Sequence, residues 1–172
     1  MSDFVTGRFR RLVEILIGIE GGDKITNRKN DRGGLTKFGI SQRSYPTLDI
    51  RRLTRDDAVQ IYHKDFWMPV RGDEFAAEKI AQLVFEFGVN AGPGTAAKAL
   101  QRALNGLGRP LSVDGRIGRA TIAAANAAQP DALAAAFRRE AADHYEQIVA
   151  HDPTQQENAN GWANRIKERE GG

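Results

Sequence analysis

The sequence predicts a mainly α-helical protein, a helical bundle with one small irregular or β-hairpin region after its first helix. Two observations support this fold class. Apolar residues recur at helical spacing along most of the 172-residue chain, and glycine, asparagine and aspartate gather between residues 21 and 39. The hydrophobic fraction of 41% can supply a sizeable core, and a charged fraction of 27% is ordinary for a globular protein. Disorder is therefore excluded as a class.

The helices follow in order from the spacing of apolar residues and from the breaks between them. The first is expected over about residues 8–20, because these apolar side chains share one face: Phe9, Leu12, Val13, Leu16 and Ile17. A capping box at Thr54–Asp57 opens the second helix, and Pro69 ends it. Further helices are expected over about residues 74–90, 96–104, 119–127, 131–150 and 155–168. A glycine-rich loop separates them at residues 107–118.

The composition changes near Gly92. Most aromatic residues precede this glycine, and the chain that follows it is rich in alanine. We therefore expect one part in residues 1–92 and a helical module in residues 93–172 that packs on it. A single continuous helical fold is the alternative.

Charge and residue content exclude several classes of protein. Lys and Arg number 25 and Asp and Glu 22, so a net charge of +3 with dispersed basic residues does not indicate nucleic-acid binding. The absence of cysteine excludes a disulfide scaffold and a thiol nucleophile. The three histidines, His63, His144 and His151, are scattered, so no metal site is expected, and no cofactor either.

The sequence shows no segment suited to a membrane. The apolar run at residues 12–19 is short and contains Glu14, whereas a span needs about 20 mostly apolar residues. The amino-terminal residues lack the features of a signal peptide. We therefore expect a chain made in the cytoplasm without stable membrane insertion.

The candidate catalytic residues are Glu20, Asp31 and Thr36. Glu20 ends the first helix within its apolar arc, and both positions favour the protonated carboxylic acid that a general acid needs. Asp31 lies in a polar loop, where it should stay ionised, and with the Thr36 hydroxyl it can hold a water. Two carboxylates in opposed environments suit glycosidic bond cleavage. The structural alternatives are a solvated helix end for Glu20 and a turn residue for Asp31.

The segments that contain these residues resemble a known family. The runs Glu20-Gly21-Gly22, Asp31-Arg32-Gly33-Gly34-Leu35-Thr36 and Phe38-Gly39-Ile40-Ser41 are similar to the signature of the glycoside hydrolase family 108 lysozymes. These are muramidases, found largely as bacteriophage endolysins and prophage products. The resemblance continues through residues 84–92 and through Asp114–Thr121, which is similar to a predicted peptidoglycan-binding module. It covers nearly the whole chain, from Phe9 to Arg165.

The resemblance implies a fold and an activity. The expected fold is mainly α, of the α+β lysozyme-like type, with the catalytic part in residues 1–92 and a peptidoglycan-binding-type module in residues 93–172. The implied substrate is bacterial peptidoglycan, cut at the β-1,4 bond between N-acetylmuramic acid and N-acetylglucosamine. Glu20 would protonate the leaving oxygen, and Asp31 with Thr36 would position water or stabilise positive charge. The spacer between Glu20 and Asp31 has ten residues and is longer and more basic than the family pattern.

Four further residues are expected to contact the glycan. Tyr45, Tyr62 and Trp67 are candidates for lining a groove by stacking on sugar rings, with core packing as the alternative for Tyr62 and Trp67. Asn90 is a candidate for binding an acetamido group, or else a helix cap.

Three other functions compete with hydrolysis by a muramidase. They are a lytic transglycosylase, a chitinase and a non-catalytic cell-wall binding protein. A monomeric phage endolysin that reaches the cell wall through a pore such as a holin is the expected role, with a secreted effector as the alternative.

Overall fold

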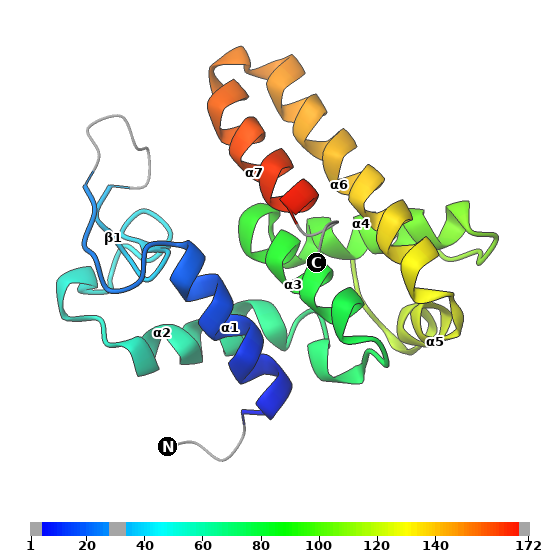
Figure 1. Cartoon of the computed structure of the whole chain (residues 1–172), viewed down its shortest axis with the longest axis horizontal. Helices are drawn as coiled ribbons and strands as arrows, with labels where there is room; N and C mark the ends of the chain where they lie inside the picture. Colours follow the sequence, from blue (N-terminus) through cyan, green and yellow to red (C-terminus); the bar gives the residue numbers. More distant parts are fainter. Residues whose placement is uncertain (1–4, 28–33, 169–172) are drawn as a thin grey trace. The chain divides into compact units, whose positions relative to one another are not determined.

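The computed structural model of the chain is mainly helical and describes residues 5–27 and 34–168 (Figure 1). Within those residues the chain forms seven α-helices and one two-stranded hairpin after the first helix, which confirms the predicted fold class. The side chains of residues 162–163 and 165–168 are not described. The chain divides into two compact units, residues 1–73 and 74–172. None of the helices in the described part is long and apolar enough to cross a membrane.

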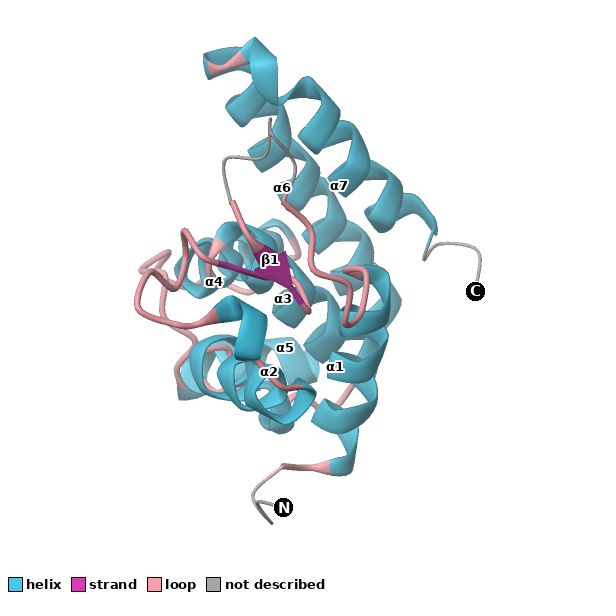
Figure 2. Ribbon diagram, turned by 90° about the vertical axis from the view of Figure 1, so that its left-hand side faces the viewer, coloured by secondary structure: helices cyan, strands magenta, loops and turns pink. Residues whose placement is uncertain are grey.

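The first unit holds the irregular region that the sequence predicts. Its elements are α1 (Gly7–Ile19), β1 (Thr36–Lys37), β2 (Ile40–Ser41), the 3₁₀-helix η1 (Ile50–Arg52), α2 (Arg55–Tyr62) and the π-helix η2 (His63–Trp67). A further 3₁₀-helix, η3 (Gly72–Glu74), follows. In Figure 2 the magenta strand marks the hairpin. Its strands are antiparallel, with Thr36 opposite Ser41 and Lys37 opposite Ile40.

The apolar face of α1 lies in the core of the first unit. All five residues that the helical spacing assigned to this face are at most 3% exposed. The Phe9 ring contacts the rings of His63 and Trp67, at centroid distances of 4.9 and 5.3 Å. A β-carbon added to Gly72 would lie 2.4 Å from the Trp67 ring, so this glycine allows the indole to pack against the backbone. Packing of α1 on the α2–η2 segment is thus set by aromatic contacts.

The predicted helix at residues 54–67 changes its form halfway along. Its capping box is present, because the Asp57 N–H donates to Thr54 Oγ1 at 3.1 Å and the Thr54 N–H donates to Asp57 Oδ2 at 3.0 Å. After Tyr62 the α-helix widens into a π-helix through Trp67. A π-turn adds a residue to the helical turn and changes the direction of the side chains beyond it. Periodicity in the sequence does not reveal such a widening.

The second unit consists of helices. They are α3 (Glu78–Ala91), α4 (Pro93–Gly106), α5 (Arg119–Ala127), α6 (Pro130–His151), the 3₁₀-helix η4 (Pro153–Gln155) and α7 (Gln156–Glu168). Gly92 separates α3 from α4 with a φ of 95°, and Pro93 starts the next helix at a position that suits proline. Helices α6 and α7 lie side by side (Figures 1 and 2).

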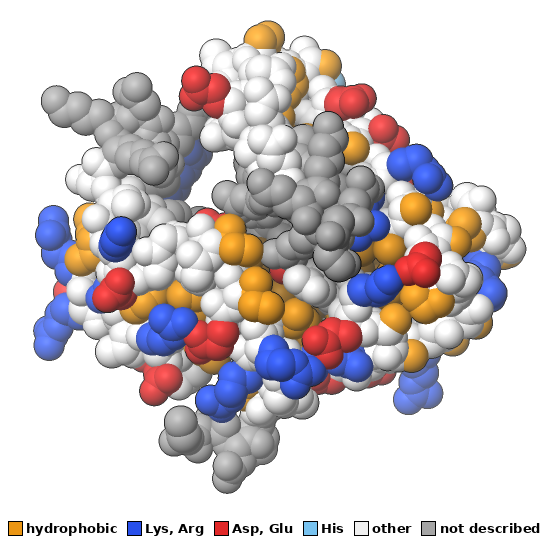
Figure 3. Space-filling view, in the orientation of Figure 1, with side chains coloured by type: hydrophobic (Ala, Val, Ile, Leu, Met, Phe, Trp, Pro, Cys, Tyr) orange, Lys and Arg blue, Asp and Glu red, His pale blue; other side chains and the backbone are white. Residues whose placement is uncertain are grey.

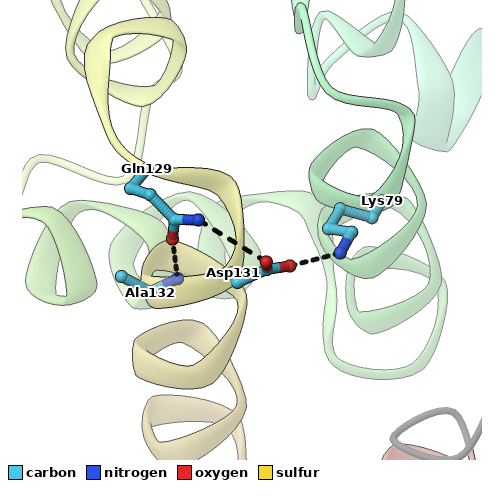
Figure 4. A network of polar contacts seen from close by, with 4 residues as sticks. All are labelled: Lys79, Gln129, Asp131 and Ala132. Carbon is cyan, nitrogen blue, oxygen red and sulfur yellow. Dashed lines mark hydrogen bonds and ion pairs between the residues drawn. The ribbon is translucent and has the colours of Figure 1, made fainter.

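The amino terminus of α6 is tied to α3 by polar contacts (Figure 4). Gln129 caps the helix, since its side-chain oxygen accepts the Ala132 N–H at 2.6 Å. Asp131 pairs with Lys79 of α3 and also accepts a hydrogen bond from Gln129 at 3.5 Å. These contacts lower the pKa of the Asp131 carboxyl, the Lys79 interaction being the largest cause. The network orients α6 within its unit.

A buried amide organises the loop before α5. Gln101 is 1% exposed, and its Nε2 donates to Asp114 Oδ1 at 2.8 Å, to the Arg116 carbonyl at 3.0 Å and to Thr121 Oγ1 at 3.3 Å. Its Oε1 accepts the Gly115 N–H at 3.1 Å. The Asp114–Thr121 segment is thus fastened to α4 from inside the unit.

Replacement of Gln101 by leucine should destabilise the protein by about 1–3 kcal/mol, because it removes the amide that the buried Thr121 hydroxyl and three groups of the loop bond to. Urea unfolding followed by circular dichroism measures the loss. Gln147→Ala, an exposed change on α6, should stay within about 0.5 kcal/mol of wild type. Equal stability of the Gln101→Leu variant would show that the loop does not need this amide.

His144 should make the stability depend on pH. Its ring packs edge-on against Phe87, and burial, with the Arg102 charge second, lowers the pKa of His144 below its usual 6.5. The unfolded chain therefore binds the proton more readily, and stability should fall as the pH drops below about 6.5. His144→Phe keeps an aromatic ring without the titration, so its unfolding free energy should decline less on acidification. Parallel curves for the two proteins between about pH 5 and 8 would contradict this assignment.

Candidate active site

The end of α1 places Glu20 at the centre of the candidate site. The helix ends in a Schellman motif, in which the Gly22 N–H donates to the Ile17 carbonyl at 2.9 Å and the Gly21 N–H to the Gly18 carbonyl at 3.4 Å. Gly21 and Gly22 have φ angles of 94° and 60°, which side chains rarely adopt. Glu20 is the C-cap and is half-buried. The geometry of this helix end thus explains why two glycines follow Glu20.

The hairpin turn lies against this helix end. Its two central residues, Phe38 and Gly39, have φ angles of 53° and 78°, as a type I′ turn requires. A phenylalanine rarely adopts this conformation, which costs free energy unless the surroundings hold it. Three restraints hold it here: Phe38 is 4% exposed, its N–H donates to the Gly22 carbonyl at 3.0 Å, and its carbonyl accepts the Tyr62 hydroxyl at 2.9 Å.

Gly39 is the point where three segments of the first unit meet. A β-carbon added to Gly39 would lie 2.5 Å from the Tyr62 hydroxyl oxygen and 3.0 Å from both Cβ and Cγ of Glu20. The end of α1, the hairpin turn and the end of α2 are therefore in close contact here. Burial first, and then the electrostatic influence of Glu20 and Tyr45, raises the pKa of the Tyr62 phenol. The phenol beside Glu20 is thus kept neutral.

Thr36 lies in the middle of a small antiparallel arrangement. It pairs with Ser41 in the hairpin and forms a bridge to Thr26 on its other side, with both N···O distances at 2.9 Å. Its hydroxyl donates to the Gly34 carbonyl at 3.2 Å. The bridge between Thr26 and Thr36 thus brings together the two ends of the segment that contains Asp31. Asp31 itself lies outside the described residues, so its catalytic role stays a prediction.

Tyr45 is half-buried and has a carboxylate partner that sequence reasoning missed. Its hydroxyl donates to Asp65 Oδ2 at 2.8 Å, and burial, followed by this hydrogen bond, raises the pKa of the Tyr45 phenol. Gln42 orders the same loop by donating to three carbonyls, those of Tyr45, Pro46 and Leu48. Asp65 lies in the π-helix. The sequence indicated this residue only as an acidic side chain between two candidate aromatic residues, Tyr62 and Trp67.

Two of the predicted glycan contacts lie in the core. Tyr62 and Trp67 are each 1% exposed, so neither ring offers a face on which a sugar can stack. Trp67 Nε1 donates to Asp73 Oδ2 at 3.1 Å, and Asp73 Oδ1 accepts the Thr6 hydroxyl at 2.6 Å. Both aromatic residues therefore follow the core-packing alternative, because their polar atoms find partners inside the unit.

Asn90 lies in the second compact unit. It is exposed in the last turn of α3, immediately before the break at Gly92. Its contact with an acetamido group stays a prediction.

The described residues contain no group of three His, Asp or Glu side chains that could hold a metal ion. Basic and acidic side chains are interspersed over the face shown in Figure 3. What the first unit does offer is a half-buried carboxyl at a helix end, next to a neutral buried phenol and near a hydroxyl-bearing hairpin. That arrangement suits proton donation by an acid.

Comparison with known proteins assigns the two parts of the sequence. A family model described as Glycosyl hydrolase 108 matches residues 13–92, and one described as Predicted Peptidoglycan domain matches residues 95–167. No curated protein matches the chain. A solved structure titled "Structure of Brucella abortus SagA" is similar in fold, with a TM-score of 0.78 and 22% sequence identity over 96% of this chain and 94% of that one.

The first family model ends at residue 92 and the second begins at residue 95. The sequence boundary between the compact units falls earlier, after Asp73. The predicted domain boundary at Gly92 stays a prediction. The chain carries a glycosyl hydrolase 108 domain in residues 13–92, followed by a predicted peptidoglycan domain in residues 95–167, which makes it a peptidoglycan-degrading glycoside hydrolase.

Proposed function

We propose that the chain is an N-acetylmuramidase that cleaves the β-1,4 bond between N-acetylmuramic acid and N-acetylglucosamine. The observation that supports this most is the placement of Glu20, a half-buried glutamate at a helix end whose Cβ and Cγ lie against Gly39. Hydrolysis of a glycoside needs an acid that is protonated when it meets the leaving oxygen.

In the proposed reaction Glu20 transfers its proton to the glycosidic oxygen as the bond to the sugar carbon breaks. Asp31 and Thr36 are proposed to provide the attack on the sugar carbon from which that bond breaks. Either they hold the water that attacks the opposite face of the ring, Asp31 taking its proton, which inverts the configuration. Or Asp31 attacks the sugar carbon to form a glycosyl-enzyme intermediate, which water then hydrolyses as Glu20 takes the proton of that water, and the two displacements together retain the configuration. Thr36 is suited to this role because the hairpin and its bridge to Thr26 fix its backbone on both sides.

Residues 95–167 are proposed to keep the enzyme on its polymeric substrate, in line with the description of the family model that matches them. We further propose a monomeric phage endolysin that is made in the bacterial cytoplasm and reaches the cell wall through a pore such as a holin. Expression in a bacterium with and without a holin tests this role. Lysis only with the holin supports it, whereas lysis without any pore protein contradicts it.

Replacement of Glu20 by glutamine should abolish cleavage of purified peptidoglycan, because the amide cannot donate the proton. Wild type should release fragments with new reducing N-acetylmuramic acid ends, read by mass spectrometry. Glu86→Gln is the matched control: Glu86 is a half-buried glutamate on α3 that accepts a hydrogen bond from Gln82 at 3.0 Å, and this variant should cleave like wild type.

The outcomes of this experiment separate the competing functions. Anhydro-muramic products from wild type would show a lytic transglycosylase, in which no water is positioned. Full activity of Glu20→Gln would remove Glu20 from the mechanism. No cleavage by either protein would favour a cell-wall binding protein.

Asp65 should act on substrate binding by orienting Tyr45. Loss of their hydrogen bond, which involves a carboxylate, costs about 1.5–3 kcal/mol where the pair is not compensated by water. We expect Tyr45→Phe and Asp65→Ala each to raise KM several-fold with little change in kcat. The double variant should be no worse than either single one, because both remove the same contact. Additive effects would show that the two residues act independently.

A further inference from the structure

The structure points to a role for Tyr62 that differs from substrate binding. We propose that Tyr62, acting through the Phe38–Gly39 turn, is the positioning residue for Glu20. This inference rests on the proposed function, in which Glu20 is the general acid. It adds a residue that touches no substrate but decides where the acid lies.

Tyr62 holds the turn. Its hydroxyl donates to the Phe38 carbonyl at 2.9 Å, and the ring is 1% exposed. Phe38 has a φ of 53°, which a phenylalanine adopts only where the surroundings impose it. The hydroxyl is one of those restraints, since it fixes the direction of the carbonyl. The other two are burial of the Phe38 side chain and the hydrogen bond from the Phe38 N–H to the Gly22 carbonyl, 3.0 Å long.

The turn in its place supports Glu20. The space beside Gly39 Cα is bounded by Cβ and Cγ of Glu20 on one side and by the Tyr62 hydroxyl on the other. The aliphatic part of the glutamate therefore rests on the backbone of the turn. A shift of the turn moves the support of the carboxyl, and misplacement by about 1 Å can reduce a catalytic rate about 100-fold.

The turn and the end of α1 are also bonded to each other through Gly22. Gly22, which accepts the Phe38 N–H, belongs to the Schellman motif that ends α1 immediately after Glu20. The helix end and the turn are thus hydrogen-bonded to each other. Tyr62, at the end of α2, holds the same turn through the Phe38 carbonyl. A tyrosine that served packing alone would not need its hydroxyl at this point.

The test begins with Tyr62→Phe, which keeps the ring and removes the hydroxyl. On soluble glycan fragments of peptidoglycan we expect kcat to fall about 10- to 100-fold while KM stays within about twofold. Tyr145→Phe is the matched control, because Tyr145 is also a buried tyrosine, 4% exposed, but its ring packs against Phe87 in the second unit. Its kcat and KM should stay at wild-type values. An unchanged kcat in Tyr62→Phe overturns the proposal.

A second pair of variants separates positioning from loss of folding. Gly39→Ala brings its β-carbon to 2.5 Å from the Tyr62 hydroxyl oxygen and 3.0 Å from the Glu20 side chain. Adding Tyr62→Phe removes the nearer atom, so the double variant should regain part of the Tm that Gly39→Ala loses. Its kcat should not recover, because the β-carbon still presses on Glu20. Recovery of kcat together with Tm would show that stability alone was lost, and would overturn the proposal.

Glu20→Gln, measured beside these variants, shows which idea fails. If Glu20→Gln is active, the proposed function is wrong and Tyr62 has no acid to position. If Glu20→Gln is inactive and Tyr62→Phe retains full kcat, the acid assignment stands and only the positioning role is refuted.

Discussion

The candidate active site depends on one close contact, the approach of Glu20 and Tyr62 to the backbone of Gly39. A side chain at this position would collide with both, because its β-carbon would lie 2.5 Å from the tyrosine oxygen and 3.0 Å from the glutamate carbons. Only glycine provides the space and also adopts the φ of 78°. The end of α1, the hairpin and the end of α2 are arranged around this constraint.

The neighbouring elements reinforce that contact. Packing of Phe9 against His63 and Trp67 sets α1 on the α2–η2 segment, which brings Tyr62 to the hairpin. The widening of the helix after Tyr62 then orients Asp65 towards Tyr45 and Trp67 into the core. A π-helix is a costly local geometry and is frequent at functional sites. Here it lets one segment serve both the core and the candidate site.

Each unit relies on buried polar groups that have partners, and these differ in purpose. Gln101 in the second unit meets three groups of the loop before α5 and the Thr121 hydroxyl of α5, and so holds that loop against α4. In the first unit the Tyr62 hydroxyl meets a carbonyl of a strained turn. The first contact orders a connection between helices, whereas the second acts on residues next to the acid. Burial strengthens both, because an unpaired polar group in the interior costs free energy.

The sequence by itself determined the helices, the capping box, the break at Gly92 and the order of Glu20, Asp31 and Thr36, because these follow from local spacing and turn chemistry. It also gave the family resemblance that the comparisons confirm. Only the tertiary structure decided that Tyr62 and Trp67 are buried, that Asp65 meets Tyr45 and that Gly39 touches Glu20. These facts depend on segments far apart in the chain, and no local pattern encodes which buried ring meets which turn.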